Sequence, residues 1–266
     1  MDKAIIAGLT LNQNQYELNQ SLEELANLAL TLQIEVVDRI TQNRFKPTPN
    51  LYFGRGKIEE IKMSITHYEA DILIVDDTLS PAQIRNLEAS LEIQIIDRSF
   101  LILQIFSLRA QSKEAILEVK LAQNQYMLPR LVGLGKSLSR QGGGTYNAKG
   151  PGETKLEMDR RKLLDEISKI NKELKIINKQ RTQARIQRKK NEIPVVSLVG
   201  YTNAGKSAIL NNLSLLLSNS NQLAFEENIL FATLDTKSRL LQKENNPPFI
   251  LIDTVGFISK LPPELI

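Results

Sequence analysis

The chain has 266 residues, no cysteine, no tryptophan and a single histidine, His67. These counts exclude a disulfide-stabilised fold, a thiolate metal site, a cysteine nucleophile and a zinc site made of several histidines. Apolar residues make up 42% and charged residues 24% of the chain, enough for a sizeable core in one or two domains. No apolar run approaches the ~20 residues that span a bilayer, and the N-terminus lacks a signal-peptide pattern, so we expect a cytoplasmic protein with no membrane span.

Residues 1–110 alternate between helix-like and strand-like patterns. Helices are expected over 21–32 and 55–68, and Ser80-Pro81-Ala82-Gln83 is typical of a capped helix start. Strands are expected over 34–40, 71–76 and 91–96. Because strands and helices alternate with short connections, the sequence predicts a small N-terminal α/β domain with a mostly parallel sheet.

Residues 111–192 are predicted to form a basic helical hairpin or coiled coil. Apolar residues recur at helical spacing over 112–138 and over 156–188, joined by the glycine-rich stretch Arg140–Thr154, which includes Tyr146. From Lys149 to Glu192 there are 14 basic and 7 acidic residues. This excess of cations, beside glycines and an aromatic ring, favours RNA as a partner. A solvated helix face with a flexible tip would explain the same residues.

The strongest chemical signal begins where the strand-like run Val195–Gly200 ends. It is followed by G-x-x-x-x-G-K-S and a helix-like segment, which is the context of a phosphate-binding loop. Such a loop points backbone N–H groups at an anion, while Lys206 bridges the β- and γ-phosphates and the Ser207 hydroxyl coordinates Mg²⁺. The predicted loop comprises Gly200, Tyr201, Thr202, Asn203, Ala204, Gly205, Lys206 and Ser207.

Two later segments fit a nucleotide-dependent switch. An apolar strand ends in D-x-x-G, where Asp253 would hold Mg²⁺ through its water shell and the Gly256 N–H would meet the γ-phosphate. Thr233 is the candidate switch residue, whose hydroxyl closes on Mg²⁺ when the γ-phosphate is present. We therefore predict Lys206 and Thr233 as catalytic residues and Ser207 and Thr233 as metal ligands. The further predicted nucleotide-binding residues are Phe231, Ala232, Thr233, Leu234, Asp235, Asp253, Thr254, Val255 and Gly256.

Over nearly its whole length the chain resembles the HflX family of ribosome-associated GTPases. The segments that carry the resemblance are Tyr52–Lys57 with G-x-G-K, Asp97-Arg98, Ile105–Ala110, Tyr126–Leu131, Gly150–Arg161, Leu230–Asp235 and Asp253–Ile258. The resemblance implies GTP and Mg²⁺ as cofactors and GTP hydrolysis as the activity. It also implies that a monomeric factor binds the large ribosomal subunit through its rRNA, with the hairpin reaching that RNA, and splits or rescues ribosomes under stress.

The chain differs from the family pattern in two places and, in a third, from many other GTPases. Asp235-Thr236-Lys237-Ser238-Arg239 stands where the family usually has Asp-Pro-Thr-Thr-Arg. Phe257 follows D-x-x-G where many GTPases have a water-orienting glutamine, so we expect slow intrinsic hydrolysis; this replacement also resembles the family. The guanine-selecting N-K-x-D loop does not follow Gly256 within the chain. We expect three sheet strands, near 193–199, 234–241 and 249–252, so residues 193–266 should form a partial P-loop GTPase domain holding the first three of its motifs.

These observations leave three hypotheses. The chain is a portion of a ribosome-associated GTPase, or a non-catalytic remnant that binds ribosomes or RNA with weak or no hydrolysis. A phosphate-binding loop also permits an ATP-using enzyme, against which the family resemblance is the argument.

Overall fold

The computed structural model describes residues 2–10, 15–140, 151–190, 193–202, 204–217, 237–243 and 246–261. The chain divides into two compact units. The first comprises Met1–Gln104, Leu121–Ser168 and Lys260–Ile266, and the second comprises Ile105–Lys120 and Lys169–Ser259. None of the described helices is both long enough and apolar enough to cross a membrane.

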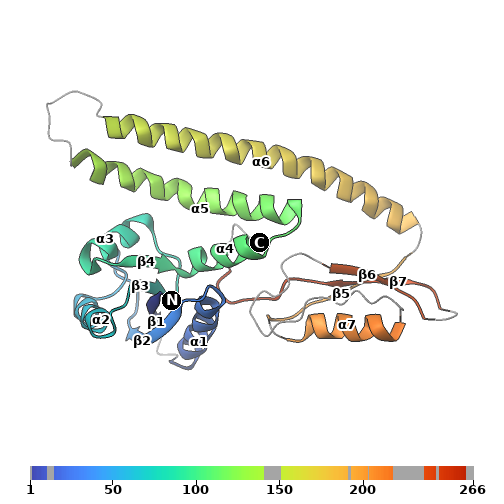
Figure 1. Ribbon diagram of the computed structural model, residues 1–266, viewed down its shortest axis with the longest axis horizontal. Helices are drawn as coiled ribbons and strands as arrows, with labels where there is room; N and C mark the ends of the chain where they lie inside the picture. Colours follow the sequence, from blue (N-terminus) through green and yellow to red (C-terminus); the bar gives the residue numbers. More distant parts are fainter. Residues whose placement is uncertain are drawn as a thin grey trace. The chain divides into compact units, whose positions relative to one another are not determined.

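The first unit contains the predicted parallel sheet, with four strands where the sequence predicts three. The strands are β1 (Lys3–Thr10), β2 (Glu35–Asn43), β3 (Ile72–Val75) and β4 (Gln94–Asp97), arranged in the order β2-β1-β3-β4 (Figure 1). The central strands β1 and β3 are almost wholly buried. This order places the topological switch point between β1 and β3, where open α/β sheets usually bind ligands at the carboxyl ends of their strands.

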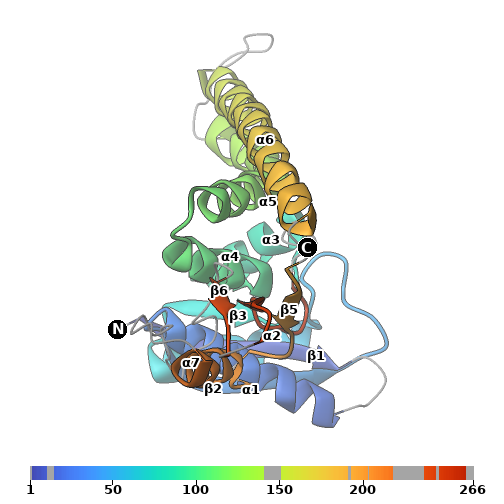
Figure 2. The same ribbon diagram turned by 90° about the vertical axis from the view of Figure 1, so that its right-hand side faces the viewer.

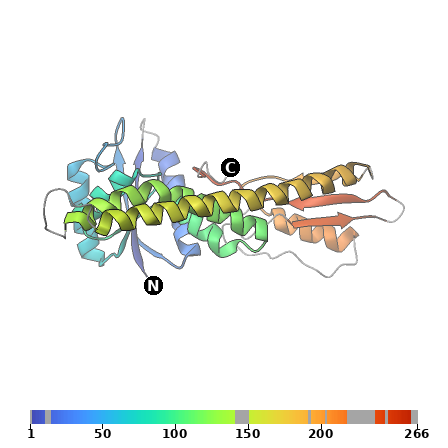
Figure 3. The same ribbon diagram turned by 90° about the horizontal axis from the view of Figure 1, so that it is seen from above.

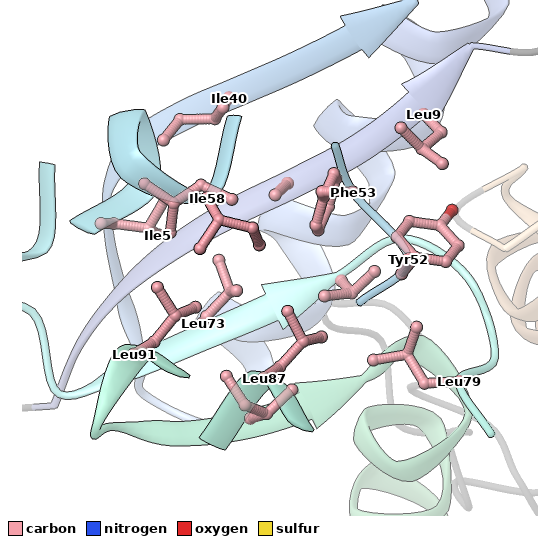
Figure 4. Packing of buried hydrophobic residues seen from close by; sticks show 14 of the residues in the cluster. Ile5, Leu9, Ile40, Tyr52, Phe53, Ile58, Leu73, Leu79, Leu87 and Leu91 are labelled. Atoms are coloured by element: carbon pink, nitrogen blue, oxygen red, sulfur yellow. The ribbon is translucent and has the colours of Figure 1, made fainter. Parts of the chain in front are cut away.

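Helices cover both faces of this sheet. α2 (Arg55–Tyr68) and α3 (Pro81–Leu91) pack on one face through Ile58, Leu87 and Leu91, which meet strand residues such as Ile5 and Leu73 (Figure 4). α1 (Gln15–Thr31) lies on the other face, where a Cβ atom on Gly8 would lie 2.8 Å from Leu18 Cδ1. α4 (Arg98–Arg109) follows β4 directly. The result is the doubly covered sheet that alternating strands and helices produce.

The local predictions in this unit succeed unevenly. Ser80 begins α3 with a capping box: its Oγ accepts from the Gln83 N–H at 3.2 Å, and Gln83 Oε1 accepts from the Ser80 N–H at 2.9 Å. The strand expected from residue 91 starts later, because Leu91 still belongs to α3 and Glu92 ends the helix with a left-handed φ of 58°. No strand was expected over Lys3–Thr10, yet β1 is central.

α5 (Lys113–Arg140) and α6 (Pro151–Lys190) form the predicted antiparallel helical pair (Figure 2). In the first unit, Asn124 Nδ2 donates to Glu166 Oε2 at 3.1 Å. In the second, ion pairs join Lys113 to Glu173 at 3.2 Å and Arg181 to Glu114 at 2.8 Å. The predicted connecting stretch is too long, because α6 already begins at Pro151, a favoured first helical residue; residues 141–150 lie outside the described part.

The second unit holds a three-stranded mixed sheet. The strands are β5 (Val195–Leu198), β6 (Lys237–Leu241) and β7 (Phe249–Asp253), in the order β5-β7-β6, with β6 antiparallel to β7. α7 (Lys206–Leu217) lies along this sheet (Figure 3), and its Leu210 is buried with Leu241 and Leu251. The described part of the predicted strand 234–241 begins at Lys237.

Candidate nucleotide-binding site

The glycine-rich loop connects the carboxyl end of β5 to the first residue of α7, as the motif predicts. Gly205 has a φ of +78°, a left-handed conformation that favours glycine, and α7 starts at the next residue. The loop therefore reaches the N-terminus of a helix, where unpaired N–H groups and the helix dipole favour an anion. Asn203 lies outside the described residues.

The Lys206 side chain is hydrogen-bonded to the backbone of its own loop. Its Nζ atom donates to the Gly200 carbonyl oxygen at 3.0 Å and to the Tyr201 carbonyl oxygen at 2.6 Å. Burial lowers the pKa of the Lys206 ammonium, and the nearby Asp253 carboxylate acts in the opposite direction. These carbonyl groups are neutral partners, so a phosphate oxygen would offer the ammonium a stronger, charge-assisted hydrogen bond.

Two oxygen-bearing side chains meet beside the loop. The Ser207 hydroxyl donates to Asp253 Oδ2 at 2.6 Å, and the Asp253 side chain is fully buried. Strand pairing brings them together, because Leu198 at the end of β5 is opposite Asp253 at the end of β7. Thr254 secures the same junction, since its hydroxyl donates to the Leu198 carbonyl at 2.6 Å. A hydroxyl and a carboxylate fit the oxygen preference of Mg²⁺.

The segment that follows D-x-x-G lies directly against the phosphate loop. The Phe257 N–H donates to the Gly200 carbonyl and the Thr202 N–H donates to the Phe257 carbonyl, each at 3.0 Å. A Cβ atom on Gly256 would lie 2.5 Å from Thr202 Cα and 2.6 Å from Thr202 N, so this position requires glycine. The motif spacing predicts a role for Gly256 but gives no sign of this backbone pairing, which depends on tertiary contact.

The structure thus brings the phosphate loop and Asp253–Gly256 together at one end of the β5–β7 pair. The predicted switch residues Phe231, Ala232, Thr233, Leu234 and Asp235 lie outside the described residues, so the catalytic and metal-binding roles of Thr233 stay predictions. Val255 is partly buried next to the D-x-x-G glycine, and Ala204 is exposed in the loop.

The carboxyl edge of the first unit's sheet also gathers charged groups, and it is filled by them. Asp76, directly after β3, is fully buried and accepts from Arg98 Nη1 at 2.6 Å and from the Ser21 hydroxyl at 2.6 Å. Arg98 also pairs with Glu24 at 2.5 Å. Lys260, which belongs to the same unit, donates to Asp76 Oδ2 at 2.8 Å. The Arg98 guanidinium, itself fully buried, occupies the place where an open site would lie.

A second buried group fastens α5 to the end of β4. Asp97 accepts from the Tyr126 hydroxyl at 2.8 Å, from Arg130 Nη2 at 3.1 Å and from the Leu79 and Phe100 N–H groups. The Arg130 guanidinium also lies 3.2 Å from the centre of the Tyr126 ring. Burial raises the pKa of Asp97, while these donors lower it. Both buried groups have structural roles, and the spacing of their residues gave no prediction of either.

Three family models cover nearly all of the chain. Residues 19–107 match the model described as GTP-binding GTPase N-terminal, and residues 109–188 match GTP-binding GTPase Middle Region. Residues 195–264 match the model described as 50S ribosome-binding GTPase. Their order agrees with the order of the parallel sheet, the helical pair and the phosphate loop.

Curated relatives and a solved structure agree with these matches. The GTPase HflX of Caldanaerobacter subterraneus subsp. tengcongensis is 49% identical over 265 residues, which cover 100% of this chain and 60% of the relative. The GTPase HflX of Escherichia coli K12 is 41% identical over 247 residues, covering 93% of this chain and 56% of the relative. The chain therefore spans about 60% of the length of such relatives.

The crystal structure of SsGBP in complex with GDP is similar at a TM-score of 0.54 and 25% identity, covering 100% of this chain and 66% of that chain. This likeness extends to a protein solved with a guanine nucleotide. Together with the two relatives and the three matched models, it supports one conclusion: the chain belongs to the HflX family of GTPases.

Proposed function

We propose that the chain binds GTP with Mg²⁺ at the phosphate loop and hydrolyses it as part of a ribosome-associated factor. The observation that carries this proposal is the meeting of Ser207 and Asp253, 2.6 Å apart, beside a loop with the G-x-x-x-x-G-K-S pattern. A helix start supplies N–H groups for phosphates, and the adjoining hydroxyl and carboxylate supply oxygens for the cation.

Each residue of the proposed site has a distinct task. Lys206 would leave the Gly200 and Tyr201 carbonyls and hold the β- and γ-phosphate oxygens. Ser207 would coordinate the cation, and Asp253 would hold it through water. Gly256 would present its N–H to the γ-phosphate, and Thr233 would close over it. Mg²⁺, when bound, supplies charge neutralisation at the phosphates.

Hydrolysis is proposed to be slow unless a partner assists. Phe257, which directly follows D-x-x-G, is 57% exposed and its backbone pairs with the phosphate loop. A phenyl ring cannot orient an attacking water as a glutamine amide does, so the group that positions water has to come from elsewhere.

Isothermal titration calorimetry with a non-hydrolysable GTP analogue tests nucleotide binding. We expect Mg²⁺-dependent heat with the wild-type chain, and its loss in Lys206→Ala. Lys243→Ala, which removes an exposed cation of the same unit, is the matched control and should bind like the wild type. Equal heats for wild type and Lys206→Ala would contradict the proposed site. Equal affinity for the ATP analogue would instead favour an ATP-using enzyme.

The proposed partner is the large ribosomal subunit, contacted at its rRNA by the basic helical pair. Supporting this proposal, α6 carries many cations, and Lys179 and Arg185 are exposed toward its C-terminal end. The match to a 50S ribosome-binding GTPase model points the same way. The cellular role we infer is splitting or rescue of ribosomes under stress by a cytoplasmic monomer.

A second candidate function is ribosome or RNA binding without hydrolysis. The observation that favours it concerns β5, an edge strand of the described three-stranded sheet, whose Val195 and Val196 are half-exposed. Apolar residues that are not covered add little stability to the phosphate loop that follows this strand, which favours a function that does not need nucleotide. Sedimentation with ribosomes, with and without the GTP analogue, separates the two functions. Nucleotide-dependent sedimentation supports the GTPase, and equal, salt-sensitive sedimentation in both conditions supports the second candidate.

A further inference from the structure

One loop of the N-terminal domain presents an aromatic ring almost entirely to solvent. Phe45, two residues after β2, is 94% exposed, and its neighbours in the chain are Arg44 and Lys46. By contrast, Tyr52 and Phe53 of the same connection are buried in the core, as Figure 4 shows. The connection therefore buries two of its aromatic rings and leaves the third outside.

The loop is held on both sides of this ring. On one side the Arg44 N–H donates to the Thr10 carbonyl at 3.1 Å. On the other, Thr48 and Tyr52 exchange two backbone hydrogen bonds at 2.8 and 2.9 Å, and Gln83 Nε2 donates to the Thr48 carbonyl at 3.1 Å. Because its flanks are fixed, the Phe45 ring is displayed on a preorganised support.

The G-x-G-K motif places a third cation, Arg55, beside Arg44 and Lys46. A Cβ atom on Gly54 would lie 2.3 Å from Arg44 Nη1, so the absence of a side chain at Gly54 lets the Arg44 guanidinium lie across the start of α2. Arg55 follows Gly54 directly and is exposed, and the first turn of α2 contains no acidic residue. The surface formed by Arg44, Phe45, Lys46 and Arg55 is hereafter the Phe45 surface.

Its charges are available to a partner. Within the described part of the chain, the ion pairs join other residues, and none includes Arg44, Lys46 or Arg55. The Phe45 surface thus combines an exposed ring with three cations and no carboxylate of its own. Single-stranded nucleic acid matches this combination, because a base can stack on the ring while phosphates meet the cations.

We propose that the Phe45 surface binds single-stranded RNA, with an unpaired base stacked on Phe45 and the phosphates on Arg44, Lys46 and Arg55. This surface is separate from the basic helical pair and gives the G-x-G-K motif a task outside the nucleotide site. The inference deepens the RNA-binding part of the proposed function and rests on it for the class of partner.

The chain lacks tryptophan, so Phe45→Trp creates a single fluorescent reporter that can still stack. We expect a 12-nucleotide oligouridine to quench this tryptophan, and an abasic oligomer of the same length to leave its emission unchanged. A Tyr16→Trp variant is the control, because Tyr16 is 70% exposed on α1. Equal quenching of both reporters, or no quenching of either, would overturn the proposal.

Affinity measurements on the full chain complete the test. By fluorescence anisotropy, Phe45→Ala should weaken oligouridine binding by about five-fold or more, the lower range for one stacked base. Its affinity for the abasic oligomer should not change. Arg55→Ala should weaken both, whereas Arg85→Ala on α3 should weaken neither. Equal affinities of Phe45→Ala and Tyr16→Ala for oligouridine, or binding to phosphatidylserine vesicles in place of oligouridine, would contradict the proposal.

The outcomes distinguish failure of the Phe45 surface from failure of the proposed function. Failure of nucleotide calorimetry or ribosome sedimentation, with selective quenching of the Phe45→Trp reporter intact, would remove the GTPase proposal and keep the Phe45 surface. If Phe45→Ala sediments with ribosomes like the wild type and the Phe45→Trp reporter is not quenched, the Phe45 surface is ruled out and the proposed function is kept.

Discussion

The two units of the chain place polar residues at the same position, the carboxyl end of parallel strands, and use them in opposite ways. In the first unit Asp76 and Arg98 satisfy one another and are fully buried. In the second, Asp253 meets the Ser207 hydroxyl while Lys206 donates to neutral carbonyls of its own loop. The Arg98–Asp76 pair is therefore structural, because each charge already has a charged partner. Lys206 has only neutral carbonyl partners, so it is available to an anion. We call the first the filled edge and the second the open edge.

Electrostatics explains the difference. Removing a guanidinium or a carboxylate from water is unfavourable by several kcal/mol, and a buried pair offsets this when its hydrogen bonds are complete. Arg98 has Asp76, Glu24 and the Ser21 carbonyl as partners, so a ligand would have to displace contacts that are already good. Lys206 would exchange two carbonyl oxygens for charged phosphate oxygens, which is favourable.

The largest expected effect comes from removing the buried Arg98–Asp76 ion pair at the filled edge of the first unit's sheet. Arg98→Met removes the fully buried ion-pair partner of Asp76 and leaves it only the Ser21 hydroxyl and Lys260. It should lower the free energy of unfolding by about 3 kcal/mol, the low end for a broken buried pair. Urea denaturation followed by circular dichroism measures this change. Arg85→Met, which removes an exposed arginine from α3, should have little effect. Similar stabilities for the two variants would show that the charges at this edge are not needed for stability.

The second-largest effect tests the close contact between Gly256 and Thr202 at the open edge of the second unit's sheet. Gly256→Ala places a Cβ atom 2.5 Å from Thr202 Cα, so the D-x-x-G segment must move away from the phosphate loop. We expect GTP-analogue affinity to fall by roughly ten-fold or more, equivalent to about 1.4 kcal/mol. Gly56→Ala is the matched control, because a Cβ atom there meets nothing within 4 Å. Unchanged calorimetry for Gly256→Ala would show that this contact does not shape the site.

A pH series probes the second buried group of the first unit. Because burial raises the folded-state pKa of Asp97 above its unfolded value near 4, the native state binds the proton more tightly. The Asp97 contribution to stability is therefore fully present below the unfolded pKa and is lost as pH rises through the folded pKa. Asp97→Asn removes this titration, so the unfolding free energy of the wild type minus that of the variant should fall as the pH rises above 4. Identical slopes in urea denaturation would contradict the raised pKa.

The sequence predicts the phosphate loop at the open edge better than the Arg98 network at the filled edge. Glycine spacing, a lysine and a hydroxyl in one short motif specify the phosphate loop, and strand pairing then brings Asp253 to Ser207. The network around Arg98 joins residues that are 22 and 74 positions apart, such as Asp76 and Glu24, so no local pattern reports it. β1 escapes prediction for a different reason: Lys3–Thr10 contains Ala4, Ala7 and Gly8, which are poor strand formers, whereas the predicted and equally buried β3 is a run of Ile, Leu and Val.

The smallest expected effect concerns how the two units begin their helices. α3 begins with the Ser80 side chain accepting from the Gln83 N–H, whereas α7 follows Gly205, which has no side chain to do so. Ser80→Ala should therefore destabilise the first unit by about 1 kcal/mol, the usual loss for an N-cap. Ser90→Ala, near the other end of α3, is the control, and thermal denaturation compares the variants. If Ser80→Ala melts like Ser90→Ala, the cap contributes little. The presence of a side-chain cap on α3, and its absence on α7, would then not explain why the two helix starts differ in their capacity to bind a phosphate.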